Sequence, residues 1–95
     1  MKFLVEIEVR LPGNLPDAER EALLAAELER GRELVDAGVI TLIWRIPGAL
    51  RNVGIWEATD ATELHEHLSS LPLFRWLTAE VTPLADHPLR PFLEG

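Results

Sequence analysis

One glutamate in a helical stretch is well placed for acid–base chemistry. Glu27 lies at the edge of an apolar stripe containing Leu24 and Leu28, one turn before Gly31. A carboxylate turned partly toward apolar surroundings has a raised pKa, which suits proton transfer. Gly31 leaves open space beside it. The pattern therefore makes Glu27 the candidate catalytic residue, and the alternative is an exposed glutamate paired with Arg30.

Two polar side chains in strand-like segments are candidates for substrate binding. The guanidinium of Arg45 could hold a carboxylate through two parallel hydrogen bonds, and the alternative is an ion pair with Glu57 or Glu80. Asn52 is unusual in a strand, and its amide could donate to a developing enolate oxygen; the alternative is a polar edge residue. Gly54, on the same face as Asn52, would allow close approach of a ligand or of another backbone.

Aromatic and histidine side chains complete the candidates. Trp44 and Trp56 are expected in the core or an interface, where they could also line a pocket. His87 precedes Pro88 in the C-terminal tail, from which it could reach a neighbouring subunit's cavity; a structural role is the alternative. We therefore add Trp44, Trp56 and His87 to the candidate substrate-binding residues.

Several kinds of chemistry are not indicated. The chain has no cysteine, no phosphate-binding glycine loop, no nucleophile elbow and no set of ligands at metal spacing. Catalysis is therefore expected to be acid–base work without a metal or cofactor. A net charge of -7 argues against nucleic acid as a partner. No apolar run approaches the roughly 18 residues of a membrane span, so we expect a soluble, cytoplasmic protein.

The elements that must position these side chains follow the order βαββαβ. A single domain over residues 1–95 is expected, because the length leaves no room for a second core. Strands are predicted over 3–11, 39–46, 50–58 and 74–81, the last with an extension to 84 as the alternative, together with a helix over 16–37 and a second helix capped by Asp60. The Pro-rich tail, about 83–95, is predicted to be extended and not helical.

This order is the ferredoxin-like split pattern, an α+β fold in which two helices cover one face of a four-stranded antiparallel sheet. Two strands are apolar on both faces, so the open face should also be covered, most economically by a second copy in a dimeric α+β barrel. In the strand 39–46, alternation places Ile40, Leu42, Trp44 and Ile46 on one face, against Val39 and Ile43.

The chain also resembles the muconolactone delta-isomerase family over nearly its whole length. The resemblance rests on an ordered set of landmarks at matching spacing: Leu11-Pro12, Ala26-Glu27, Leu34 to Gly38, Trp44-Arg45-Ile46 with Gly48, Asn52, Leu64-His65, Leu71-Pro72-Leu73-Phe74, Glu80-Val81 and His87-Pro88.

The resemblance implies a cofactor-free isomerase that converts muconolactone to the 3-oxoadipate enol-lactone in the catabolism of aromatic compounds. It implies an assembly of dimers, decameric in characterised members, and a glutamate acid/base at Glu27. The chain departs from the family at Ala49-Leu50-Arg51 and at Val53-Gly54, which are expected to line the pocket. Another small lactone as substrate, a cofactor-free monooxygenase and a non-catalytic ligand-binding oligomer are therefore the alternatives.

Overall fold

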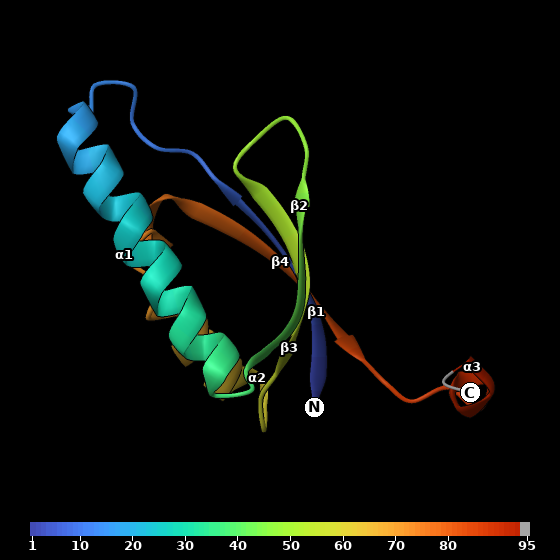
Figure 1. The fold of residues 1–95 in the computed structure, drawn as a ribbon. Coiled ribbons are helices and arrows are strands. Elements are labelled where there is room, and N and C mark those ends of the chain that lie inside the picture. Colours follow the sequence, from blue (N-terminus) through green and yellow to red (C-terminus); the bar gives the residue numbers. More distant parts are fainter. Residues whose placement is uncertain (94–95) are drawn as a thin grey trace.

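The computed structural model describes residues 1–93 and has the predicted α+β architecture. Two helices, α1 and α2, lie on one side of a four-stranded antiparallel sheet, and the C-terminal tail leaves from the other side (Figure 1). The ferredoxin-like fold class is confirmed. The elements are β1 (Lys2–Val9), α1 (Asp17–Asp36), β2 (Ile40–Ile46), β3 (Arg51–Glu57), α2 (Ala61–Ser69), a short 3-10 helix (Phe74–Trp76), β4 (Leu77–Leu84) and α3 (Arg90–Leu93).

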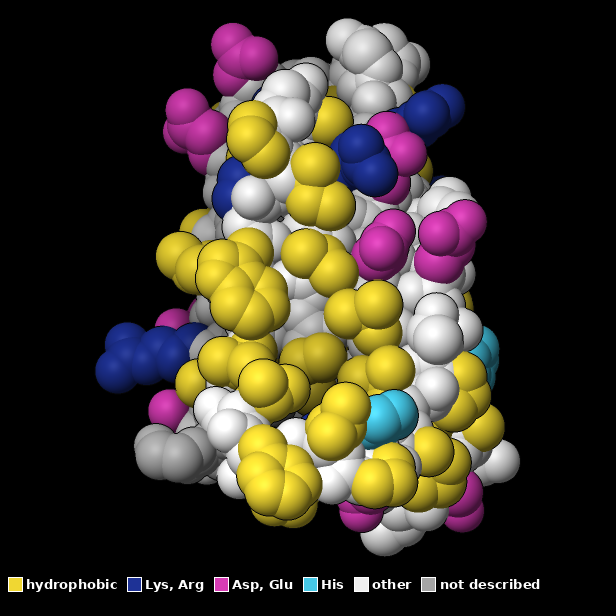
Figure 2. All heavy atoms as spheres, turned by 90° about the vertical axis from the view of Figure 1, so that its right-hand side faces the viewer, with side chains coloured by type: hydrophobic (Ala, Val, Ile, Leu, Met, Phe, Trp, Pro, Cys, Tyr) yellow, Lys and Arg dark blue, Asp and Glu magenta, His cyan; other side chains and the backbone are white. Residues whose placement is uncertain are grey.

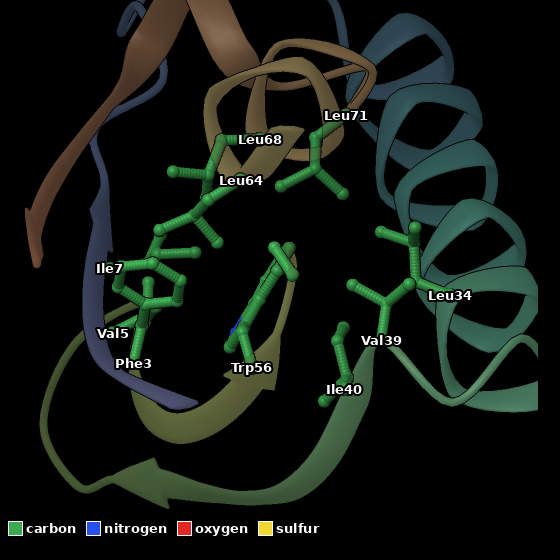
Figure 3. Packing of buried hydrophobic residues seen from close by; sticks show 11 residues of the cluster. Phe3, Val5, Ile7, Leu34, Val39, Ile40, Trp56, Leu64, Leu68 and Leu71 are labelled. Carbon is green, nitrogen blue, oxygen red and sulfur yellow. The ribbon is translucent and has the colours of Figure 1, made fainter. Parts of the chain in front are cut away.

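The sheet has the strand order β2-β3-β1-β4. Residues paired across antiparallel strands place their side chains on the same face, so the pairing of Phe3 with Trp56 and of Ile7 with Asn52 fixes which side chains point toward the helices. Trp56 lies in the middle of the resulting core, with Leu64 and Leu68 of α2 on one side and Leu34 of α1 on the other (Figure 3).

The simple alternation predicted for strand 39–46 is wrong at its start. Ile40 pairs with Trp56 and faces the core, whereas Leu42 pairs with Ile55 and lies on the open face. A β-bulge between Ile40 and Leu42 inserts Thr41, whose hydroxyl donates to the Ile55 carbonyl at 3.2 Å. The extra residue shifts the alternation of everything that follows in β2.

At Gly54 the backbones of β2 and β3 lie too close together to leave room for a side chain. A Cβ at residue 54 would fall inside contact distance of the Leu42 carbonyl oxygen and 3.3 Å from the Ile43 Cα. Of the two alternatives for Gly54, the structure therefore supports close approach of another backbone.

Helix α1 begins after Pro16, carries Asp17 and Glu19 in its first turn, and ends at Asp36, two residues before Gly38, which has a φ of +76°. The apolar stripe predicted through Leu24 and Leu28 is not buried along its length, because Leu28 is 77% exposed. Leu34 is buried, whereas the adjacent Val35 is 49% exposed. The helix therefore rests on the core near its C-terminal end and leaves Leu28 and Val35 outside the packed interior.

Helix α2 begins as predicted, because the side chain of Asp60 accepts from the Glu63 N–H at 2.8 Å. The carboxylate of Glu63 reaches back to the Thr59 hydroxyl at 2.7 Å, one residue before the cap. After the helix, Leu71 and Leu73 are both buried.

The C-terminal segment differs from the extended tail predicted for about 83–95. Strand β4 continues through Pro83 to Leu84, on the outer edge of the sheet where proline is tolerated. The tail then forms a short helix, Arg90–Leu93, in which Pro91 occupies the first turn. A first-turn proline is compatible with a helix because its missing N–H would have no intrahelical partner there. Residues 94–95 of the predicted tail lie outside the described residues.

The open face of the sheet is rich in hydrophobic side chains, which Figure 2 shows gathered across the surface opposite the helices. Leu42 is 52% exposed and Trp44 57% exposed on this face, and Leu84 is 39% exposed at the far edge. In the described part of the chain, no helix combines the length and apolar character needed to cross a bilayer.

Replacing Gly54 by alanine should lower the free energy of unfolding by about 1–3 kcal/mol, because the added methyl group must push β2 away from β3. Urea denaturation measures this change. The matched control is Gly31→Ala in α1, where a Cβ meets nothing within 4 Å and a gain of about 0.5–1 kcal/mol is expected. A Gly54→Ala variant with an unchanged free energy of unfolding would contradict the close approach of the two strands.

Candidate active site

A cavity of about 550 Å³ lies between α1 and the β2–β3 side of the sheet. This volume falls within the usual range for small-molecule sites, and the walls are mostly apolar. Three of the predicted site residues line this cavity: Glu27, Asn52 and Trp56. The other lining residues are Ile7, Leu28, Glu29, Gly31, Arg32, Val35, Ile40, Ile43 and Leu71.

Glu27 is half-buried on the side of α1 that faces the segment after α2. Its Oε1 accepts a hydrogen bond from the Leu73 N–H at 3.0 Å. Burial raises the pKa of the Glu27 carboxyl above its ordinary value of 4.5, and the hydrogen bond from Leu73 opposes this rise only in part. The alternative of an exposed Glu27 paired with Arg30 is wrong, since Arg30 bonds to Glu33 and Ser70.

Asn52 and Trp56 each bring a polar atom without a partner to the cavity lining. Asn52 Oδ1 and Trp56 Nε1 are buried, and neither forms a hydrogen bond within the described residues. Buried polar groups almost always have partners, and leaving one unpaired is costly. Two such atoms, one an acceptor and one a donor, equip the cavity for a ligand that carries polar groups of its own.

Three other predicted site residues lie outside this cavity lining: Arg45, Trp44 and His87. Arg45 pairs with Asn52, so the two share a face of the sheet, but Arg45 is exposed and donates from Nη1 to the Arg51 carbonyl at 3.2 Å. The predicted ion pair of Arg45 with Glu57 or Glu80 does not occur within residues 1–93. Trp44 lies on the opposite face of the sheet.

His87 lies in the tail, outside the cavity lining, and its Nδ1 accepts from the Leu89 N–H at 3.0 Å. This bond is local to the tail. Whether one copy's His87 contributes to another copy's site stays a prediction.

The main contribution missed by sequence reasoning is the backbone N–H of Leu73. The Leu71-Pro72-Leu73-Phe74 motif signals this segment, but its residue types do not reveal that a backbone donor meets Glu27. The motif also supplies Leu71 to the cavity wall. The predicted open space at Gly31 is confirmed, because a Cβ there would meet no atom within 4 Å.

A larger hollow of about 810 Å³ lies where the tail leaves the open face of the sheet. Lys2, Glu57 and Arg90 are among its lining residues, and none of the predicted site residues is. Within residues 1–93, no cluster of three histidine or acidic side chains is arranged to hold a metal ion.

A half-buried carboxylate with a raised pKa in an apolar cavity is a candidate group for acid–base chemistry. Comparison with known sequences identifies the family. The chain belongs to the muconolactone delta-isomerase family, whose profile matches residues 1–90.

Individual relatives agree with this assignment. The muconolactone delta-isomerase of Cupriavidus pinatubonensis is 36% identical over 88 residues, covering 93% of this chain and 96% of the relative. That of Rhodococcus opacus is 38% identical over 85 residues, covering 90% and 91%.

Solved structures agree with the fold. A crystal structure of muconolactone isomerase superposes with a TM-score of 0.85 at 34% identity, covering 93% of this chain and 92% of that one. A 5-chloro-2-hydroxyhydroquinone dehydrochlorinase from Burkholderia phenoliruptrix superposes with a TM-score of 0.69 at 21% identity, covering 92% and 96%. The dehydrochlorinase shares the fold alone.

The raised pKa of Glu27 predicts a pH-dependent effect on stability. Well below pH 4.5 the Glu27 carboxyl is protonated in both the folded and the unfolded protein, so its burial carries no ionisation penalty there. As the pH rises, the unfolded state ionises first and wild-type stability falls. We therefore expect the Tm of Glu27→Gln to exceed that of wild type by a margin that grows above pH 4.5 and then levels off. Thermal melts from pH 4 to 8 measure the margin, and a pH-independent margin would contradict the raised pKa.

Proposed function

We propose that the protein is a cofactor-free muconolactone delta-isomerase that uses Glu27 to move a proton within an unsaturated lactone. The observation that carries the proposal is the position of Glu27, half-buried in the cavity with a raised pKa. Membership of the family and the names of the relatives support the reaction class. None of these observations favours the monooxygenase or the non-catalytic alternative.

The proposed reaction begins with ionised Glu27 removing a proton from a ring carbon of the lactone. The electrons of that C–H bond pass into the conjugated system, and negative charge collects on the carbonyl oxygen as an enolate. Protonated Glu27 then returns the proton to a different carbon, which moves the double bond and leaves the enzyme unchanged. A raised carboxyl pKa suits both steps, because the group must accept and then release the same proton near neutral pH.

Asn52 and Trp56 are proposed to bind the oxygen on which charge develops. The Asn52 amide and the Trp56 Nε1–H both belong to the cavity lining, and the indole N–H has no partner among residues 1–93. Hydrogen-bond donors that are already in place cost no reorganisation when charge appears, so they lower the barrier. Arg45, on the Asn52 face of the sheet, is a proposed substrate contact at the edge of this region.

Replacing Glu27 by glutamine should lower kcat by about 10²–10⁴-fold, the usual contribution of a general acid–base group. The amide can still accept from the Leu73 N–H, so the fold should be retained. Turnover of muconolactone in D2O, followed by NMR, reports product formation and deuterium uptake together. The control is Glu21→Gln, an exposed glutamate of the same helix outside the cavity, which should keep full activity. Full activity of Glu27→Gln would refute the proposal.

We also propose that the open face of the sheet is covered by a second copy of the chain, as in a dimeric α+β barrel. Leu42 and Trp44 leave a broad apolar surface on this face (Figure 2). Contiguous exposed apolar surface of this kind is typical of an interface, and an exposed tryptophan is a frequent centre of binding energy. This arrangement would also bury Trp44 against the partner.

A charge at the centre of this surface should prevent association. Trp44→Glu is expected to shift the protein to monomers at micromolar concentration, because the carboxylate would have to be buried against a second sheet. Sedimentation velocity measures the mass. Ala18→Glu, which adds the same charge at an exposed position of α1, should leave the assembly intact. An unchanged mass for Trp44→Glu would show that another surface is used.

A further inference from the structure

We propose that Arg32 binds a carboxylate on the ligand and so makes the cavity selective for small anions. The inference rests on the proposed function for the identity of the reacting end of the ligand. Arg32 is not among the residues proposed above to contact the substrate, such as Glu27, Arg45 and Asn52. The structural basis for adding it is its position on α1.

Arg32 lies on the stripe of α1 that lines the cavity. Leu28, Gly31 and Val35 belong to the same lining, at the spacing of three and four residues that defines one face of a helix. Glu27 lies on the more buried side of this face, where it meets the Leu73 N–H. The apolar walls thus carry a fixed positive charge at the exposed rim and a carboxyl group farther in.

The guanidinium of Arg32 is also available to a ligand. It forms no hydrogen bond or ion pair with the other residues in 1–93. Arg30 and Arg45, in contrast, each donate to protein oxygens. Glu29 shares the cavity lining three residues earlier, but it makes no ion pair with Arg32 in the described chain.

Charge explains why such a residue would be needed. With a net charge of -7, the protein as a whole repels small anions. A local cation that stays charged at all relevant pH values and offers two parallel N–H donors offsets this repulsion at one point. Arg32 lies five positions after Glu27, about 7.5 Å farther along the helix axis, and both side chains line the cavity. A ligand with a carboxylate at one end and an enolisable carbonyl at the other would contact both.

The test compares two ligands that differ only in charge, muconolactone and its methyl ester. Calorimetric titrations into a Glu27→Gln background avoid turnover. Arg32→Gln should weaken muconolactone binding about 10–100-fold, the usual loss when a charge-assisted hydrogen bond is removed. Binding of the ester should change less than about 2-fold, since an ester offers no charge to lose. Arg32→Lys should lie between wild type and Arg32→Gln, because it keeps the charge and loses the paired donors.

The matched control is Arg20→Gln, which removes the same charge from an exposed position of α1 outside the cavity and should leave both affinities unchanged. With Glu27 intact, Arg32→Gln should raise KM for muconolactone and leave kcat unchanged. The inference is overturned if Arg32→Gln loses the same affinity for both ligands or loses affinity for neither. It is also overturned if muconolactone does not bind measurably, or if Arg45→Gln alone removes the preference for the acid over the ester.

Two results keep this inference separate from the proposed function. Loss of anion preference in Arg32→Gln, together with an enzyme that does not turn over muconolactone, would support the anion site and refute the isomerase proposal. Normal turnover that depends on Glu27, with an Arg32→Gln variant identical to wild type, would support the isomerase proposal and refute the anion site.

Discussion

The close approach of β2 to β3 at Gly54 is the constraint on which the arrangement of the site depends. Without a side chain at residue 54, the Leu42 carbonyl can lie against the β3 backbone. The bulge at Thr41 then shifts the alternation along β2 by one residue. This shift brings Arg45 to the face of Asn52 and sends Trp44 to the open face. The division of the sheet into a cavity side and an open apolar side therefore begins with one missing side chain.

The pKa of Glu27 depends on two opposing effects of its surroundings. Burial against the core favours the neutral carboxyl, whereas the Leu73 N–H favours the carboxylate. Burial raises the pKa more than the hydrogen bond lowers it. Because the N–H comes from the segment after α2, the position of that segment is tied to the acidity of a residue in α1.

The sequence predicted the class of the fold and the partial burial of Glu27, because both leave periodic signals. Alternation in β1, the capping residue Asp60 and the edge position of Glu27 each reflect a local rule that the folded chain obeys. The bulge at Thr41 and the Leu73 N–H were not predictable in this way. A bulge depends on contact between two backbones, and a backbone donor has the same chemistry in every residue type except proline.

Only part of the predicted set of site residues lies together, because contacts between separate elements do not follow from local sequence patterns. Glu27, Asn52 and Trp56 meet because strand register and helix packing converge on one cavity. Trp44 is adjacent to Arg45 in the chain, but neighbours in a strand point to opposite faces, so one dipeptide motif serves two surfaces. The short helix at Arg90–Leu93 shows that several prolines do not exclude a helix when one of them falls in the first turn.

Gly31 gives this scaffold a simple route to divergence. Its backbone does not require glycine, and the space beside it belongs to the cavity. Side chains of increasing size could therefore be accepted at this one position, each reducing the room for a ligand while leaving the strands, the helix ends and Glu27 unchanged. Descendants of one ancestral sequence could in this way come to accept differently sized substrates through single substitutions, without first passing through an unstable intermediate.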